Sequence, residues 1–504
     1  MNRATNKRIG IIKPVMFLVL AAMQIVLYVN IIGAIIAAWQ EQILLIPALL
    51  AVFVVNVVPV MFSIVARQSN PNIKLSWLVF VLAFPLVGGI WHEIFGGGLF
   101  ARRVRNTYSA QFGKNLDFLE QGPKVLEELA DSDSAVLGQA YTVLNTSGFP
   151  VYKSTRTSLF QNGDDFLQIL FDELTKAKKF ILIECGALCT GDVYNGVFDI
   201  LERKAQEELE IKIIYDKKSS GSSLPRGFRQ SCQGVGIHAR GFGALGTERD
   251  NRLMIVIDGN VAFCSTSSSL SDNLLRGGST MFVLRGDAVW SCSVLFMNMW
   301  DAITKSSSDY APYRPTLTYH EEHGYAAVFG DSPANELHPI RTVYLKMISS
   351  ANSYVYIQTP NLQLDEVLSH SLKLAAASGV DVRLITSALT AHPLDGQSTR
   401  AYYAQLLASG VKIYEYEGTL NSKSLICDDT ACLITTANLD YSSLLRNHEL
   451  AVWLSADESV FETKDDFMAI LQNSHEITSK TWRKHAKGLR KAWYAVLRAL
   501  APVV

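Results

Sequence analysis

The sequence lacks an excess of charge of either sign. Its 46 Lys and Arg residues and 47 Asp and Glu residues leave a formal net charge of −1 over 504 residues. A chain with so little net charge creates no long-range field that would recruit nucleic acid or repel a membrane. We therefore expect no nucleic-acid partner, and the length allows two or three domains.

The sequence also has only seven cysteines. The number is odd, and no spacing matches a zinc site with paired ligands. Most of these residues lie inside apolar runs, where a cysteine is usually a small core residue. The sequence therefore predicts neither a disulfide framework nor a metal site, and we expect no cofactor.

Charged residues are nearly absent from three long stretches near the N-terminus, at about 15–39, 43–66 and 77–100. Each stretch is long enough to cross a hydrocarbon core, which takes about 20 residues. A cleaved signal peptide has a shorter apolar run and no second run behind it. The first two stretches predict a transmembrane hairpin. The third carries Pro85 and is either a kinked third span or a re-entrant segment.

The basic residues beside these stretches do not agree on an orientation. Lys and Arg in the N-terminal tail favour a tail on the inner side, which with three spans places the large domain outside. Arg102, Arg103 and Arg105, after the third stretch, favour the opposite orientation. We expect a multi-pass membrane region over 1–105 and a linker over 106–148, with the side of the large domain left open.

Beyond this linker, short β-rich runs alternate with helical patterns, and the same order occurs twice. In the first copy a strand at 178–185 precedes a helix, a second strand and a strand pair at 252–265. The second copy repeats this order and ends in a strand pair at 423–438. Two copies of one α/β unit, at 149–315 and 324–475, are the direct interpretation.

The order and spacing of these segments resemble those of the bacterial cardiolipin synthases, a family of the phospholipase D superfamily. The resemblance extends from Trp77 to the C-terminus and is carried by WLVFVLAFPLVGGIWHEIFG, GFPVYKSTRTSLFQNGDDFLQILFDELTKAKKFILIE, FGDSPANE and TRAYYAQLLASGVKIYEYEGTLNSK. It implies an α/β fold in which two phospholipase D-type α/β/α sandwich units pack as a pseudo-dimer, preceded by N-terminal transmembrane helices.

The resemblance also implies an activity. In that family one histidine attacks a phosphodiester and another protonates the leaving glycerol oxygen, which imidazole can do because its pKa lies near neutrality. Lysines neutralise the charge of the phosphate. The family transfers phosphatidyl groups to make cardiolipin, so the resemblance implies phosphatidylglycerol and cardiolipin as substrates or ligands, and the bacterial cell membrane as the location.

Each unit of that family contributes one motif of the form His-x-Lys-x4-Asp, and both motifs are altered here. In the first copy, NRLMIVID, asparagine stands in place of the histidine and Leu253 in place of the lysine. In the second copy, NSKSLICD, asparagine again replaces the histidine, but the lysine and the aspartate remain. The positions equivalent to the two motifs are Asn251, Asp258, Asn421, Lys423 and Asp428.

The resemblance assigns further residues to the phosphate pocket of the family: Lys423, Asn438, Thr436, Ser268 and Glu449. An asparagine amide cannot take over the histidine chemistry, because its nitrogen lone pair is delocalised. Since a general acid or base alone contributes about 10²–10⁴-fold, we expect weak or absent family activity. His392, His320 and His323 are candidate replacements, but each has the sequence context of a surface histidine.

Three functions therefore remain open. The chain is an inactive relative that binds anionic phospholipid or an active cardiolipin synthase paralogue, a working phosphatidyltransferase with an unusual residue set, or a structural membrane protein. The segment 476–504 adds a lipid signal, because basic residues alternate with tryptophans and leucines at near-helical spacing. Such a basic amphipathic helix is typical of a contact with anionic lipid, and the alternative is a helix that closes the domain.

Overall fold

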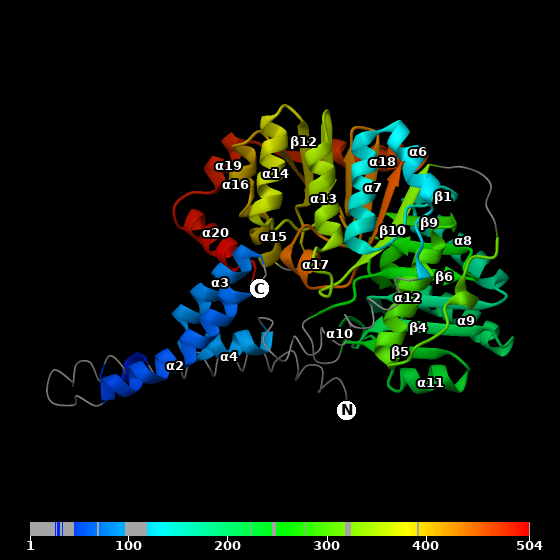
Figure 1. Cartoon of the computed structure of the whole chain (residues 1–504), viewed down its shortest axis with the longest axis horizontal. Helices are drawn as coiled ribbons and strands as arrows, with labels where there is room; N and C mark the ends of the chain where they lie inside the picture. The colour runs from blue at the N-terminus through cyan, green and yellow to red at the C-terminus, as the bar shows by residue number, and fades with distance from the viewer. Residues whose placement is uncertain are drawn as a thin grey trace. The chain divides into compact units, whose positions relative to one another are not determined.

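The computed structural model describes residues 45–67, 70–95, 118–221, 223–243, 248–276, 278–317, 324–390 and 393–502, with a few positions between 26 and 33. The described residues divide into two compact units (Figure 1). The first comprises those of 1–106 together with the C-terminal residues from Ala499, and the second comprises those of 107–498.

The described residues of the first unit include α2 (Leu45–Ala66), α3 (Pro71–Ala83) and α4 (Pro85–Phe95). Proline occupies the first position of α3 and of α4, where its missing N–H has no intrahelical partner to lose. The stretch expected over 77–100 is therefore divided between two helices at Phe84. Within the described residues, no helix combines the length and the apolar character needed to cross a membrane. The stretch expected over 15–39 lies almost wholly outside them.

The second unit has a mixed α/β fold with two large sheets (Figure 1). The first sheet has the strand order β1-β9-β7-β6-β2-β4-β5. Its strands, in chain order, are β1 (Thr155–Phe160), β2 (Phe180–Cys185), β4 (Glu210–Asp216), β5 (His238–Phe242), β6 (Leu253–Ile257), β7 (Val261–Ser265) and β9 (Met281–Gly286). Strands β2, β4 and β5 are parallel, and the other neighbours are antiparallel.

The second sheet repeats this order and adds one strand at its edge, giving β10-β16-β15-β14-β11-β12-β13-β17. Its strands are β10 (Tyr325–Asp331), β11 (Tyr354–Gln358), β12 (Asp381–Ser387), β13 (Lys412–Tyr416), β14 (Ser424–Cys427), β15 (Ala431–Thr435), β16 (Glu449–Ser455) and β17 (Ser474–Ile477). The strands named in the sequence analysis are present in this repeated order, and the structure adds strands that it did not name, among them β1, β9, β10 and β16.

Two long helices occupy equivalent places after β9 and β16. Helix α12 (Val289–Thr304) contacts several strands of the first sheet and also β10, whereas α18 (Glu458–Gln472) contacts the second sheet and also β1. All side chains from Val289 to Asp301 are buried, as expected of a helix that is apolar on every face. One continuous buried cluster contains residues of both sheets, including Phe282 and Trp453.

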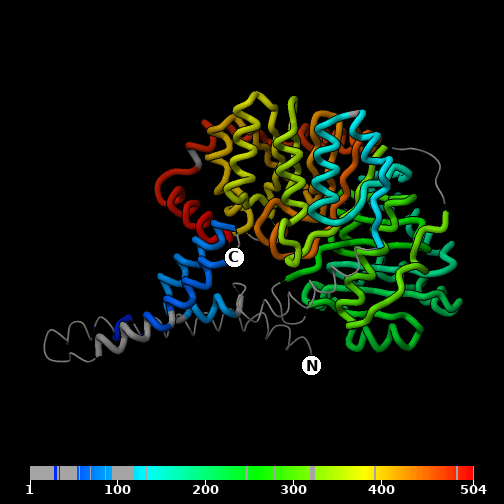
Figure 2. The backbone as a smooth tube through the Cα atoms, viewed as in Figure 1, coloured from blue at the N-terminus to red at the C-terminus, as the bar shows by residue number. Residues whose placement is uncertain are grey.

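The segment expected to be a linker is part of this core. It contains α6 (Pro123–Ser132) and α7 (Ser134–Ser147), and α7 lies beside α13 (Pro339–Ser350) (Figure 2). The indole N–H of Trp453 donates to Gln139 on α7 at 2.9 Å. The linker prediction was therefore wrong for these residues, since apolar and polar contacts fix them to the second sheet.

The remaining helices cover the sheets. In the first half these are α8 (Gly163–Lys176), α9 (Asp192–Gln206), α10 (Lys217–Ser220) and α11 (Phe228–Gly234). In the second half they are α14 (Glu366–Ala377), α15 (Pro393–Arg400), α16 (Tyr403–Leu407) and α17 (Tyr441–Leu445). The single C-terminal helix expected over 476–504 is instead the end of β17 followed by α19 (Ser479–His485) and α20 (Leu489–Leu500), separated at Gly488, whose φ is +54°.

Candidate functional site

The two altered motifs lie where the two sheets meet. Asn251 stands just before β6, and its backbone N–H donates to the His448 carbonyl of the second sheet at 2.9 Å. Asn421 stands just before β14, and its backbone N–H donates to the Gly278 carbonyl of the first sheet at 2.6 Å. Each motif thus begins with a backbone hydrogen bond to the other half of the repeat.

The side chain of Asn251 crosses the same boundary. Its Nδ2 donates to Oε1 of Glu449 at 2.6 Å, and the Thr436 hydroxyl contacts the other carboxylate oxygen. Glu449 is fully buried at the start of β16. Burial raises the pKa of Glu449 to about 8, although the hydrogen bonds from Thr436 and Asn251 and the charge of Lys423 oppose this shift.

The side chain of Asn421 makes the corresponding contact in the other direction. Its Nδ2 donates to Oγ of Ser279 at 3.0 Å, and its Oδ1 accepts a hydrogen bond from Lys423 at 2.8 Å. Both asparagine amides are therefore fixed by hydrogen bonds. Neither has a free nitrogen lone pair like that of imidazole. The geometry orders the site without supplying a nucleophile at either histidine position.

Lys423 is the one motif lysine that remains, and it lies between the two halves. Its Nζ donates to the Thr266 carbonyl at 3.1 Å and to the carbonyl and Oδ1 of Asn421, both at 2.8 Å. An ammonium group has three N–H donors, so these contacts use all of them. Burial lowers the pKa of Lys423 to about 8, and the carboxylates of Glu449 and Asp440 partly offset that effect.

Ser279 is a site residue that the motif comparison missed. The backbone N–H of Thr280 donates to Thr266 Oγ1 at 3.0 Å, and that of Leu450 donates to Thr436 Oγ1 at 2.9 Å. These matching contacts make Ser279 the counterpart of Glu449 in the first sheet. The signal was present in the sequence, because Ser279 follows Thr266 at the same separation as Glu449 follows Thr436.

The two motif aspartates lie at the far ends of their strands from the asparagines. Asp258 accepts from the backbone N–H groups of three successive residues at the start of β2, at 2.8 to 3.0 Å. Asp428 does the same at the start of β11, at 2.6 to 2.9 Å. Both have a left-handed backbone, with φ of 53° and 52°. Each aspartate therefore connects the end of its own strand to the start of a neighbouring strand. Neither belongs to the hydrogen-bond network around Lys423.

Asn438 and Ser268 follow β15 and β7 at equivalent positions and are partly exposed. Asn438 hydrogen-bonds to the Asp440 carboxyl group, whose pKa is raised by burial. Within the described residues, Asn438 Oδ1 is buried and accepts no hydrogen bond. The Ser268 carbonyl accepts from the Ala187 N–H at 2.9 Å.

A buried cluster of charged side chains around Arg252 lies next to the first motif. Arg252 pairs with Glu184 at 2.6 Å and with Asp250 at 2.9 Å, and all three side chains are buried. Burial raises the pKa of Glu184 well above its usual range, although the charge of Arg252 opposes the shift. The motif comparison also missed these two contacts of Arg252. They fix the residues on either side of Asn251, because Asp250 precedes it and Arg252 follows it.

His448 adjoins the site, since its backbone carbonyl accepts from Asn251. His448 is buried against Phe242, with ring centroids 5.0 Å apart, and burial lowers the pKa of His448 to about 3. It is therefore neutral at physiological pH. His320, His323 and His392 lie outside the described residues. In the described part of the chain, no three His, Cys, Asp or Glu side chains gather to hold a metal ion.

Comparisons with known proteins agree on one family. The model of the cardiolipin synthase phospholipase D-like domain matches residues 344–471. An uncharacterized protein of Streptococcus mutans is 30% identical over 458 residues, covering 88% of this chain and 98% of that protein. A cardiolipin synthase of Geobacillus kaustophilus is 27% identical over 508 residues, covering 95% of this chain and 99% of that enzyme.

The fold comparison points the same way. The crystal structure of a phosphatidylserine synthase from Haemophilus influenzae matches with a TM-score of 0.54 and 11% identity, covering 73% of this chain and all of that structure at 100%. At 11% identity, this similarity shows a shared fold and nothing about function. The matched domain and the relatives that match nearly end to end lead to one conclusion: the chain belongs to the cardiolipin synthase family of the phospholipase D superfamily.

Proposed function

We propose that the chain is a non-catalytic member of this family that binds anionic phospholipid, either phosphatidylglycerol or cardiolipin. The observation that carries the proposal is the state of the two histidine positions. Each holds an asparagine whose amide is hydrogen-bonded to a partner in the other half, Asn251 to Glu449 and Asn421 to Ser279. Neither amide can attack phosphorus or move a proton at neutral pH.

Two features support a retained affinity for the lipid headgroup. Lys423 keeps a buried cation at the centre of the site, and a phosphate oxygen can take the place of Asn421 Oδ1 on that ammonium group. The unpaired Oδ1 of Asn438 can accept a hydrogen bond from a headgroup hydroxyl, which removes the cost of a buried polar atom without a partner. Phosphatidylglycerol offers both a phosphate and hydroxyl groups.

The overall arrangement fits this proposal. We infer that 149–315 and 324–475 are two α/β/α units paired as a pseudo-dimer. The identical strand order and the reciprocal contacts of α12 with β10 and α18 with β1 support the pairing. The site would then be a joint product of both units.

The test is an activity measurement on the purified full chain. Phosphatidylglycerol is supplied in mixed micelles, and cardiolipin and glycerol are measured beside an intact cardiolipin synthase. We expect no product above the protein-free blank. Turnover comparable to that of the intact enzyme would overturn the proposal and favour the alternative of a working synthase with an unusual residue set.

The other alternative is a protein that only scaffolds the membrane or an active synthase paralogue. Lipid co-purification separates it from the proposed function, because a scaffold carries no excess of anionic phospholipid. Pull-down of an active synthase from the native membrane, by a chain that retains no lipid, would favour the paralogue partner.

We also propose that the first unit attaches the protein to the cell membrane through several helices. Its helices bury Val57 and Trp77 yet leave Val55 70% and Phe62 72% exposed. Helices that are apolar both inside and outside a small unit need lipid to cover their outer face. The full chain should stay in the membrane pellet after alkaline carbonate extraction, and release into the supernatant would contradict this attachment.

A further inference from the structure

The C-terminal helices carry charge of one sign only. From Ser479 to the end the sequence has no Asp or Glu, and it has seven basic residues: Lys480, Arg483, Lys484, Lys487, Arg490, Lys491 and Arg498. Of these, Lys480, Arg483, Lys487, Arg490 and Lys491 are exposed. The whole chain is nearly neutral, so this concentration of charge is local.

One face of α20 is held against the second unit. The ring of Tyr494 stacks on Trp482 at 5.6 Å, and Trp482 in turn packs against Tyr403 at 5.2 Å. Arg498 donates to the Ala401 carbonyl at 3.1 Å. The helix therefore has a fixed rotation, and its other face is presented outward as a consequence.

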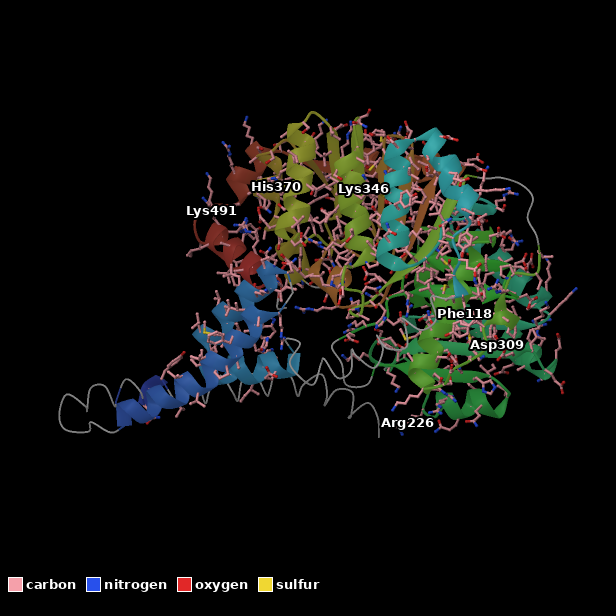
Figure 3. All side chains as sticks on the ribbon, in the orientation of Figure 1. Phe118, Arg226, Asp309, Lys346, His370 and Lys491 are labelled. Carbon is pink, nitrogen blue, oxygen red and sulfur yellow. The ribbon has the colours of Figure 1, made fainter. Side chains whose placement is uncertain are left out.

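That outer face is apolar. Leu489, Trp493 and Val496 follow one another at spacings of four and three residues, which places them on one side of a helix. They are 90%, 42% and 45% exposed. The indole N–H of Trp493 donates to Gln397 at 2.7 Å, so the ring is held at the edge of the face. Lys491, labelled in Figure 3, is exposed as well.

We propose that the outer face of α20, defined by Leu489, Trp493 and Val496 with its flanking basic residues, rests on the surface of an anionic lipid bilayer. The basic residues favour a lipid surface over a protein groove as the partner of this face. An apolar stripe alone would fit a protein groove as well, but the exposed charges of α19 and α20 are all basic, without one acidic residue, and match a surface of lipid phosphates. Tryptophan at the rim of such a face suits the boundary between headgroups and acyl chains.

This surface is separate from the site around Lys423, and the two proposals can fail independently. The site binds one headgroup, whereas the outer face of α20 binds an interface and needs no particular lipid beyond its charge. The consequence is a second attachment that holds the C-terminal part of the second unit at the membrane.

The test uses the full chain reconstituted into vesicles with brominated acyl chains, which quench the fluorescence of nearby tryptophan. The wild type and Trp493→Phe are compared in phosphatidylcholine alone and in a mixture with phosphatidylglycerol. Subtracting the variant isolates Trp493 from the other tryptophans. We expect Trp493 to be quenched in the mixture, and much less in phosphatidylcholine alone.

A charge variant completes the test. Replacing Arg490 and Lys491 by glutamate should reduce the docked population about fivefold or more for each charge removed, since one basic residue near such a surface contributes on this scale. The matched control changes Lys124 and Lys176, two exposed lysines elsewhere, and should leave quenching unchanged.

Three results would overturn the proposal. Trp493 that is not quenched in either vesicle excludes contact with lipid. Equal quenching with and without phosphatidylglycerol excludes recognition of charge. Protection of Trp493 from an aqueous quencher that rises with protein concentration in lipid-free detergent would assign the outer face to a second copy of the chain.

Discussion

At the scale of single residues, an asparagine in place of histidine can still form hydrogen bonds, but it can neither attack phosphorus nor transfer a proton at neutral pH. Asn251 still reaches Glu449, and Asn421 still sits beside Lys423. An amide can donate and accept, but it does not titrate near neutrality. On the proposed function, the site therefore keeps an ordered network with a buried cation and lacks the two imidazoles to which the family resemblance assigns the phosphodiester chemistry.

The first prediction concerns Lys423. Replacing it by alanine should weaken binding of short-chain phosphatidylglycerol to the detergent-solubilised full chain about tenfold or more, because a hydrogen bond to a charged group contributes about 1.5–3 kcal/mol. Titration calorimetry measures the loss. Lys423→Met keeps the volume and should show the same loss, and the exposed Lys176→Ala should show none. Unchanged affinity in both Lys423 variants would mean that the pocket is vestigial.

A second prediction concerns pH and Glu449. Its folded pKa of about 8 lies above the usual carboxyl value near 4.5, so between these two values the folded protein binds a proton that the unfolded chain has released. The free energy of unfolding should therefore fall as pH rises from about 5 to 8. Glu449→Gln cannot release this proton, so its decline should be shallower. Parallel pH profiles of thermal unfolding for the two proteins would show that Glu449 is ionised throughout.

At the scale of elements, the motif aspartates belong to the scaffold. Each binds three backbone N–H groups of the neighbouring strand from a left-handed position. The tight turn that follows each motif strand therefore needs an acceptor and a residue that tolerates positive φ. This explains how both aspartates remain while the histidines do not.

The third prediction separates a structural role of Asp428 from a role in binding lipid. Asp428→Ala should lower the free energy of unfolding by about 2 kcal/mol, since it leaves backbone donors unpaired and strains a non-glycine residue at positive φ. Asp428→Asn should cost less, because asparagine keeps one acceptor and adopts this conformation more readily. The folded fraction of both should bind phosphatidylglycerol like the wild type. A loss of affinity without a loss of stability would return Asp428 to the binding site.

Local patterns predicted the elements that local interactions determine. The strand pairs around 258–260 and 428–430 followed from apolar runs joined by turn residues, and the structure has them. The helices α6 and α7 were missed, because α7 is fixed by partners such as Trp453, which is 314 positions from Gln139. Ser279 was missed because it matches no residue of the family motif, and only the equal separations of Ser279 from Thr266 and of Glu449 from Thr436 indicate it; its partner Asn421 is 142 positions away in the other copy.

At the scale of the whole molecule, the site exists only because two copies of one unit meet. The contacts of Asn251 with Glu449 and of Asn421 with Ser279 are related by the repeat, whereas the hydrogen bonds of Lys423 have no counterpart. The second copy contributes a lysine and a glutamate, whereas the first contributes Leu253 and Ser279 at those positions. Relative to the family motif, the first half therefore lacks the histidine and the lysine and has no carboxylate where the second half has Glu449, whereas the second half lacks only the histidine.

This asymmetry sets the last prediction, which concerns recovery of cardiolipin synthesis. Asn421→His alone should give no product in a host without cardiolipin synthase, because the mechanism needs one histidine as nucleophile and another as acid in the same step. Product from that single variant would mean that another residue is the nucleophile, with His392 the first to test. The triple change of Asn251→His, Leu253→Lys and Asn421→His should give weak activity at most.

The structure explains why the triple change falls short and what it still lacks. An imidazole placed at position 251 faces the Glu449 carboxylate, whereas one placed at position 421 faces only the Ser279 hydroxyl. A protonated imidazole beside Glu449 opposes the effect of burial on the pKa of that carboxyl group, so an ion pair can form that holds the ring in one orientation and stabilises its protonated form. Adding Ser279→Glu to the triple change should therefore raise cardiolipin formation above that of the triple variant, and Ser279→Gln, of the same size but uncharged, should raise it less. Equal product from both would show that orientation, and not charge, is what the first half has lost.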